Sequence, residues 1–277
     1  MRDEDNRLHV EPSFLQKNAE LYHADAYSAP FDESTLRDIN NWISEKTDGQ
    51  IENMLDEISY DTVMYLINAV LFDAEWQDIY QKNAVIRDSF TNSKGKSETV
   101  DFMYDDEGIG FKLDGAVALA RPYAGGTYEF VAVLPDEGTT PEDYLKTLDA
   151  ETLLDAMSGS RKSAFTAIPK FSLNTDTELS NILEGFGMKL AFGGEADLSA
   201  LGYSDRGPLY ISCVLHSAVI EVNERGTKAG AATIVEVNDE SAMMTELHVT
   251  LDRPFIFFIC DTATHTPIFC GIVNSVA

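Results

Sequence analysis

The sequence is poor in basic residues and contains no long apolar run. It has 20 Lys plus Arg against 47 Asp plus Glu among 277 residues, which gives a formal net charge of −27. A chain with this balance lacks the basic patches with which proteins bind nucleic acid and anionic membrane surfaces. No run approaches the roughly 18 consecutive apolar residues of a membrane-spanning helix. We therefore expect neither nucleic acid nor a membrane as a partner.

Cysteine is also scarce. Cys213, Cys260 and Cys270 have no metal-ligand spacing, and an odd number leaves at least one unpaired. Cys260 and Cys270 could face each other across a hairpin that turns at residues 264–266, but a role as small buried hydrophobic residues is favoured. Residues 1–5 contain no apolar signal-peptide segment.

Motifs that carry catalysis are absent. The sequence has no Gly-x-Ser-x-Gly, no His-Glu-x-x-His, no phosphate-binding glycine loop and no EF-hand spacing. The five histidines are scattered and none lies beside a candidate nucleophile in the sequence. We therefore expect a protein that is not an enzyme, with no cofactor and no metal site.

Hydrophobic periodicity predicts a mixed α and β chain. Apolar spacing predicts helices over residues 13–22, with Ser13 as the cap, and 33–46, with Gly49 as a stop. Further helices are predicted over 143–157 and 177–186, and a hairpin turn over 92–95. Strands are predicted at 8–10, 62–72, 128–134, 255–259 and 268–273. No repeat, low-complexity segment or composition break divides the chain, so residues 1–277 are predicted to form a single domain.

One stretch, residues 219–258, has an unusual composition. A strand over 219–223 and a turn over 224–226 precede residues 227–237, whose odd-numbered side chains are all small or apolar. This period of two predicts a strand, but Ala229 to Ala232 are too small to anchor one at a sheet edge, and Gly230 weakens it. Small side chains suit a segment that slides between existing strands, so we predict a strand that forms only some of the time.

These residues resemble a known family. The run ERGTKAGAAT from Glu224 to Thr233 resembles the reactive-loop hinge of the serpins, the serine protease inhibitors. The run RPFIF from Arg253 resembles the family's strand after that loop, and segments from residue 39 onward match in order. The resemblance implies a serpin-like α+β fold, with a large central sheet, a mobile reactive loop over residues 225–252 and a second, C-terminal sheet.

The resemblance also implies roles for particular residues. The hinge would comprise Glu224, Gly226, Thr227, Ala229, Ala231 and Thr233. Asn68, His216 and Trp76 would lie where the central sheet opens, with His216 paired to Asn68. Typical inhibitory members place the hinge glutamate sixteen residues before the residue that donates the scissile carbonyl, so the reactive bond would be Glu240–Ser241. A shifted register would place the bond near Met243 or Met244 instead.

The implied function is inhibition of a serine protease, or of a cysteine protease, by a suicide route at an extracellular location. Non-inhibitory serpins tend to carry bulky or charged residues where this chain has Ala229 to Ala232. Arg225 and Lys228 depart from the commonest acidic residues and are expected to face solvent. The alternatives are a serpin-fold binding protein and an inactive fragment, because by resemblance the family's N-terminal part is missing. Without that part we expect the apolar faces of residues 62–72 and of the C-terminal hairpin to be uncovered.

Overall fold

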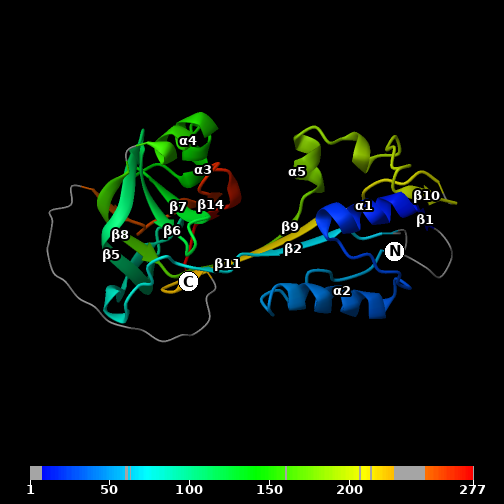
Figure 1. The fold of residues 1–277 in the computed structure, drawn as a ribbon, viewed down its shortest axis with the longest axis horizontal. Helices are drawn as coiled ribbons and strands as arrows, with labels where there is room; N and C mark the ends of the chain where they lie inside the picture. The colour runs from blue at the N-terminus through cyan, green and yellow to red at the C-terminus, as the bar shows by residue number, and fades with distance from the viewer. Residues whose placement is uncertain are drawn as a thin grey trace. The chain divides into compact units, whose positions relative to one another are not determined.

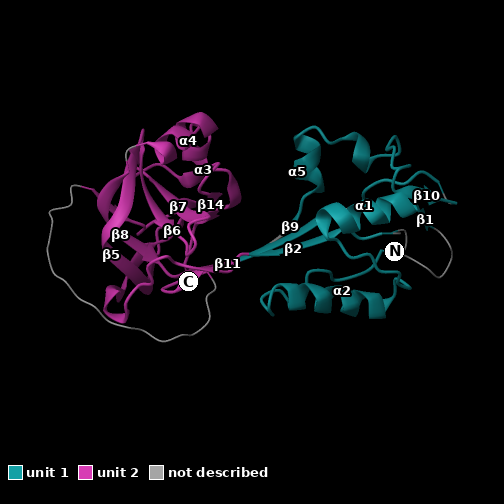
Figure 2. Cartoon of the chain, viewed as in Figure 1, with its two compact units in different colours: residues 1–71, 174–219 teal, residues 72–173, 220–277 magenta. Residues whose placement is uncertain are grey.

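The computed structural model describes residues 8–59, 62, 64–159, 161–205, 207–212, 214–227 and 247–276, with nothing stated for the side chain of Asp176. It contains helices and large sheets, so the predicted mixed fold is confirmed (Figure 1). The chain divides into two compact units (Figure 2). Unit 1 comprises Met1–Leu71 and Asn174–Val219, and unit 2 comprises Phe72–Leu173 and Ile220–Ala277. No helix in these described ranges combines the length and apolarity needed to cross a bilayer.

Unit 1 holds most of the helices. Its elements are β1 (Leu8–Val10), α1 (Pro12–Tyr22), α2 (Glu33–Lys46), β2 (Ile67–Leu71), α5 (Ser180–Gly185), the 3-10 turn η2 (Leu190–Phe192) and β10 (Gly202–Ser204). β1 pairs antiparallel with β10. The strands β9 (Phe171–Glu178) and β11 (Leu215–Asn223) have residues in both units.

The two long helices of unit 1 begin in different ways. α2 has the predicted bounds, and the side chain of its cap Asp32 accepts hydrogen bonds from the backbone N–H groups of Ser34 and Thr35. α1 lies close to the predicted range, but Ser13 is not its cap. The cap is Glu11, which makes no side-chain bond, and Pro12 occupies the first turn. A proline there has a preset φ and no N–H to satisfy, so the helix can start without a capping side chain.

Unit 2 is built on an eight-stranded sheet. The strand order is β13-β8-β5-β6-β7-β14-β15, and β4 pairs with β5. These strands are β4 (Val85–Thr91), β5 (Ser97–Leu113), β6 (Ala116–Pro122), β7 (Tyr128–Pro135), β8 (Lys162–Pro169), β13 (His248–Thr250), β14 (Phe255–Asp261) and β15 (Pro267–Val273). The predicted turn over 92–95 and the predicted C-terminal hairpin are both present.

The central strand β7 is covered on both faces, as its apolar run predicted. Phe130 and Ala132 belong to one buried cluster, and Val131 and Val133 belong to another. The second cluster includes side chains of the short helices α3 (Pro141–Leu145) and α4 (Ala150–Ser158). Alternate side chains of a strand point to opposite faces, so β7 joins two layers of core.

Three predicted elements are wrong in extent. The helix over 143–157 is broken into α3 and α4, because Thr140 and Asp149 each cap a separate helix through a side-chain oxygen. The helix over 177–186 is only α5, since β9 continues to Glu178. The strand over 62–72 is reduced to β2, which is only partly buried rather than covered on both faces.

A second sheet contains the strands that position the hinge, in the order β2-β11-β12-β3. β2 pairs in parallel with the first half of β11, from Leu215 opposite Ile67 to Val219 opposite Leu71, within unit 1. In unit 2, the end of β11 pairs with β12 (Gly226–Thr227), and β12 pairs with β3 (Ala74–Glu75). The predicted strand and turn that lead into the hinge are thus present.

The cysteines of the C-terminal hairpin do not face each other. Cys270 is opposite Phe258 and Cys260 is opposite Pro267, and both are free thiols. Cys260 is buried as expected, and burial raises the pKa of its thiol to about 12. Cys270 is exposed, contrary to the prediction of a buried role. Cys213 lies outside the described residues.

Candidate functional site: the hinge in unit 2

The hinge strand β12 occupies a narrow position between the end of β11 and β3. Gly226 is opposite Asn223 on one side and Glu75 on the other. Its φ is +157°, and a Cβ atom built there would lie 2.1 Å from the carbonyl oxygen of Ala74. Only glycine fits such a close approach of two backbones.

Thr227 is the second residue of β12 and is fully buried. Its Oγ1 lies 2.6 Å from the hydroxyl of Tyr123, which is 1% exposed. The Tyr123 ring stacks on Trp76 at a centroid distance of 4.6 Å and an interplanar angle of 14°. Burial raises the pKa of Tyr123, with the Thr227 hydrogen bond opposing that shift, so the phenol stays protonated at neutral pH.

Trp76 and the residues after it hold the main chain of the hinge. The indole Nε1 of Trp76 donates to the carbonyl of Asn223 at 2.8 Å, and its backbone N–H donates to the carbonyl of Arg225 at 2.8 Å. The backbone N–H of Tyr80 donates to the carbonyl of Glu224 at 3.0 Å. We call residues 76–80 the clasp segment, because its hydrogen bonds go to three successive hinge carbonyls.

Two ion pairs flank the hinge turn. The Lys170 ammonium lies 2.6 Å from the Glu224 carboxylate and 3.7 Å from that of Asp101. The Lys170 hydrogen bond lowers the pKa of Glu224, against the opposing effect of burial. Arg225 pairs with Glu75 at 2.5 Å and its side chain is only 16% exposed, so the expectation that Arg225 faces solvent is wrong.

In unit 1, Asn68 and His216 are register partners on the parallel strands β2 and β11. Asn68 is exposed and His216 is half-buried. The backbone therefore brings together the two residues that the resemblance assigned to one site. The same pairing continues through Ala69 and Val70 toward Leu71.

Comparison with known proteins identifies the family. The family described as "Serpin (serine protease inhibitor)" matches residues 4–276. The chain belongs to the serpin family. The predicted resemblance is thus confirmed, and the family's described activity is protease inhibition rather than catalysis.

Individual relatives resemble this serpin over most of its length. Iripin-5 of Ixodes ricinus is 33% identical over 87% of this chain and 62% of its own. The thermophilic serpin tengpin, crystallised in its native state, is 43% identical with a TM-score of 0.90, covering 98% of this chain and 70% of that one. Human thyroxine-binding globulin complexed with its ligand is 24% identical with a TM-score of 0.84, covering 98% and 72%, which shows the fold alone. The chain spans less than two thirds of the length of Iripin-5.

Several residues predicted for this serpin's site lie outside the described residues. They are Lys228, Ala229, Ala231, Thr233, Glu240, Ser241, Met243 and Met244. Of the predicted hinge, the structure places Glu224, Gly226 and Thr227, all in unit 2 with Trp76. Within the described ranges, no group of three or more potential His, Cys, Asp or Glu ligands could hold a metal ion.

Sequence reasoning missed five residues of the hinge region in this serpin, including Glu75, which pairs with Arg225. Tyr123 bonds to Thr227 across 104 positions of sequence, and Lys170 pairs with Glu224. Tyr80 and its neighbour Arg121 were not noted at all. Each makes contacts with residues far away in the sequence, and hydrophobic periodicity carries no signal for such contacts.

Proposed function

We propose that this serpin inhibits a serine protease, or a cysteine protease, as a suicide substrate at an extracellular location. The protease would attack the bond Glu240–Ser241 and form its acyl-enzyme. The segment from Thr227 onward would then insert into the sheet of β2 and β11, carrying the tethered protease with it. Serpin-family membership and the geometry of the hinge support this proposal.

The observation that carries the proposal is the pairing around β12. Gly226 and Thr227 already occupy a strand position between the end of β11 and β3. Earlier along the sheet, β2 and β11 pair directly with each other through five residue pairs. For a longer β12 to lie between β2 and β11, the β2–β11 pairs would have to separate. Each of these two strands would then pair with the inserted segment. The small residues at 229–232 fit that requirement, since bulky side chains would clash between two strands.

Insertion would displace the protease far enough to distort it. Residues 227–240 are fourteen in number, and at about 3.3 Å each they span tens of ångströms. Displacement of catalytic groups by even ~1 Å can reduce a rate about a hundredfold, so deacylation would stall. The uncleaved inhibitor must then be metastable and protected by a kinetic barrier.

The decisive experiment combines a protease panel with denaturing gel electrophoresis. A Glu-specific serine protease should form a denaturant-stable complex, and mass spectrometry should map the cut after Glu240. Glu240→Arg should move inhibition toward trypsin-like enzymes, because it reverses the charge offered to the specificity pocket. A cut after Met243 or Met244 would refute the register. Failure to trap any protease would instead favour one of the two alternatives, a serpin-fold binding protein or an inactive fragment.

A pair of hinge variants tests insertion. Thr227→Arg should abolish the complex while cleavage stays fast, because a charged side chain would enter a buried sheet position without a partner. Ala231→Pro should do the same by removing a ladder hydrogen bond. Lys228→Ala is the matched control and should leave the complex intact, because the alternating pattern points residue 228 to solvent. Retention of the complex in both hinge variants would show that this segment does not insert.

A further inference from the structure

Arg121 is a buried cation beside the clasp segment. Its side chain is 9% exposed and lies at the end of β6. Its Nη1 donates to the Asp105 carboxylate at 2.5 Å, and its Nη2 donates to the backbone carbonyl of Asp78, inside the clasp segment. The guanidinium lies over the ring of Tyr80, 3.7 Å from its centroid, and 5.7 Å from that of Trp76.

The buried Arg121 side chain does not give this part of unit 2 its greatest possible stability. Among the described residues, neither Arg121 Nε nor the Tyr80 hydroxyl has a hydrogen-bond partner, although both atoms are buried. Buried polar atoms without partners destabilise a fold, and an apolar side chain of similar size often replaces a buried ion pair without loss of stability. What Arg121 provides instead is position, since it fixes the carbonyl of Asp78 and the ring of Tyr80 together.

Those two contacts bear directly on the hinge. Trp76 and Tyr80, at the two ends of the clasp segment, donate their backbone N–H groups to Arg225 and Glu224. Arg121 touches both aromatic rings and the backbone between them, and its hydrogen bonds and ring contacts among the described residues do not include the hinge itself. We propose that Arg121 is a positioning residue that holds the clasp segment against the hinge turn and slows its release. The effect on loop insertion rests on the proposed function, whereas the clasp itself does not.

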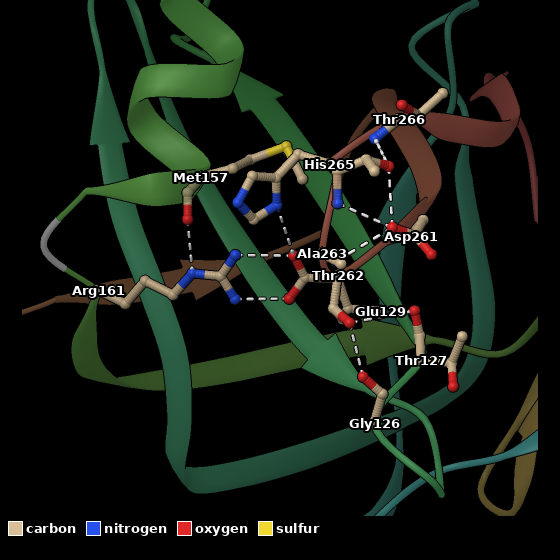
Figure 3. Close-up of polar contacts among 11 residues, drawn as sticks. Gly126, Thr127, Glu129, Met157, Arg161, Asp261, Thr262, Ala263, His265 and Thr266 are labelled. Carbon is tan, nitrogen blue, oxygen red and sulfur yellow. Dashed lines mark hydrogen bonds and ion pairs between the residues drawn. The ribbon is translucent and has the colours of Figure 1, made fainter.

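The chain contains a matched control for this buried pair. Arg161 binds the buried carboxylate of Glu129 through Nη1 at 2.5 Å and Nη2 at 2.7 Å, and donates from Nε to the carbonyl of Met157 at 2.9 Å (Figure 3). Figure 3 shows this pair beside His265 on the β14–β15 hairpin. Arg161 also belongs to unit 2, but its hydrogen bonds among the described residues go to Glu129 and Met157 and not to the clasp segment or the described part of the hinge.

The test compares Arg121→Met, Arg121→Lys and Arg161→Met by hydrogen exchange with mass-spectrometric detection. Arg121→Met should accelerate exchange of the amides at 76–80 by about tenfold or more, because charge-assisted hydrogen bonds that order this segment are lost. Exchange in β7 and β14 should stay unchanged. Arg121→Lys should give an intermediate effect, since an ammonium keeps the charge but cannot span both oxygens as the guanidinium does. Arg161→Met should lower the melting temperature more than Arg121→Met does. It should leave exchange at 76–80 unchanged.

A second measurement concerns insertion. If a target protease is trapped, Arg121→Met should lower the number of inhibitor molecules consumed per trapped protease, because faster hinge release favours insertion over hydrolysis. Unchanged exchange at 76–80 in Arg121→Met, or equal acceleration in Arg161→Met, would overturn the positioning role. Accelerated exchange without any trapping by the wild type would leave the clasp supported and refute the proposed function instead.

Discussion

The hydrogen bond between Tyr123 and Thr227 gives a quantitative test of how firmly the hinge is held. Both side chains are buried, at 1% and 0% exposure, and the two oxygens are 2.6 Å apart. Tyr123→Phe keeps the ring that stacks on Trp76 but leaves the Thr227 hydroxyl buried without this partner. Leaving such a group unsatisfied costs about 1–3 kcal/mol. Thr227→Val should cost a similar amount, because it leaves the Tyr123 phenol unsatisfied.

The double variant separates the hydrogen bond from other effects. When both hydroxyls are removed, no unsatisfied group remains, so Tyr123→Phe with Thr227→Val should be less destabilising than the sum of the single variants by about 1–2 kcal/mol. Each single variant should lower the melting temperature by roughly 2–12 °C, at about 2–4 °C per kcal/mol. Calorimetry must use one scan rate throughout, because the midpoint of an irreversible transition depends on that rate.

Tyr144→Phe is the control for this cycle. The Tyr144 hydroxyl donates to the carbonyl of Asp114 at 3.0 Å, in the same unit but outside the hinge. Distant sites combine additively, so Tyr144→Phe should show no coupling to Thr227→Val. Strict additivity of Tyr123→Phe and Thr227→Val would refute the conclusion that this bond holds the hinge.

Two further predictions concern titratable groups. The pKa of Glu224 is lowered in the folded chain, so its ion pair with Lys170 stabilises the fold above the ordinary value of 4.5 and is lost as pH falls through the lower folded value. Glu224→Gln should therefore lower the melting temperature near neutral pH, by an amount corresponding to about 1 kcal/mol or less for this partly exposed pair, and the difference should vanish in acid; a difference that grows in acid would contradict the assignment. For the thiols, a disulfide reagent at pH 8 should modify Cys270 in the folded protein and leave Cys260 unmodified, because burial raises the pKa of Cys260 to about 12. Peptide mapping assigns each site, and equal labelling of both would refute the burial of Cys260.

The sequence predicted those parts of the fold that depend on local patterns. α2 was located to the residue, because its apolar spacing and a following glycine mark both ends. The break between α3 and α4 was missed although Asp149 was visible, since its capping role competes with a continuous helical spacing. The C-terminal hairpin was located, but its register was not, and the possibility that Cys260 and Cys270 face each other across it is not borne out.

The candidate site was predictable only in part for the same reason. A recognisable run of residues located Glu224, Gly226 and Thr227. The partners of these residues lie far away in the sequence: Lys170 between β8 and β9, Tyr123 directly after β6, and Glu75 in β3. Pairings of this kind are fixed by how strands assemble, so one sequence without an alignment gives no signal for them. The partial burial of Arg225 was missed because its charge alone predicts exposure.

Under the proposed function, the barrier to insertion would have two separable parts. The first is local to unit 2, where the clasp segment, the Tyr123 hydroxyl and Lys170 hold residues 223–227 by hydrogen bonds. The second lies in the direct pairing of β2 with β11, which must open along Ile67–Leu71 before a longer strand can form. Contacts that are present in the starting state but absent in the transition state set the rate at which the starting state is left. The hinge contacts would therefore govern when insertion begins, and the β2–β11 pairs would govern whether it runs to completion.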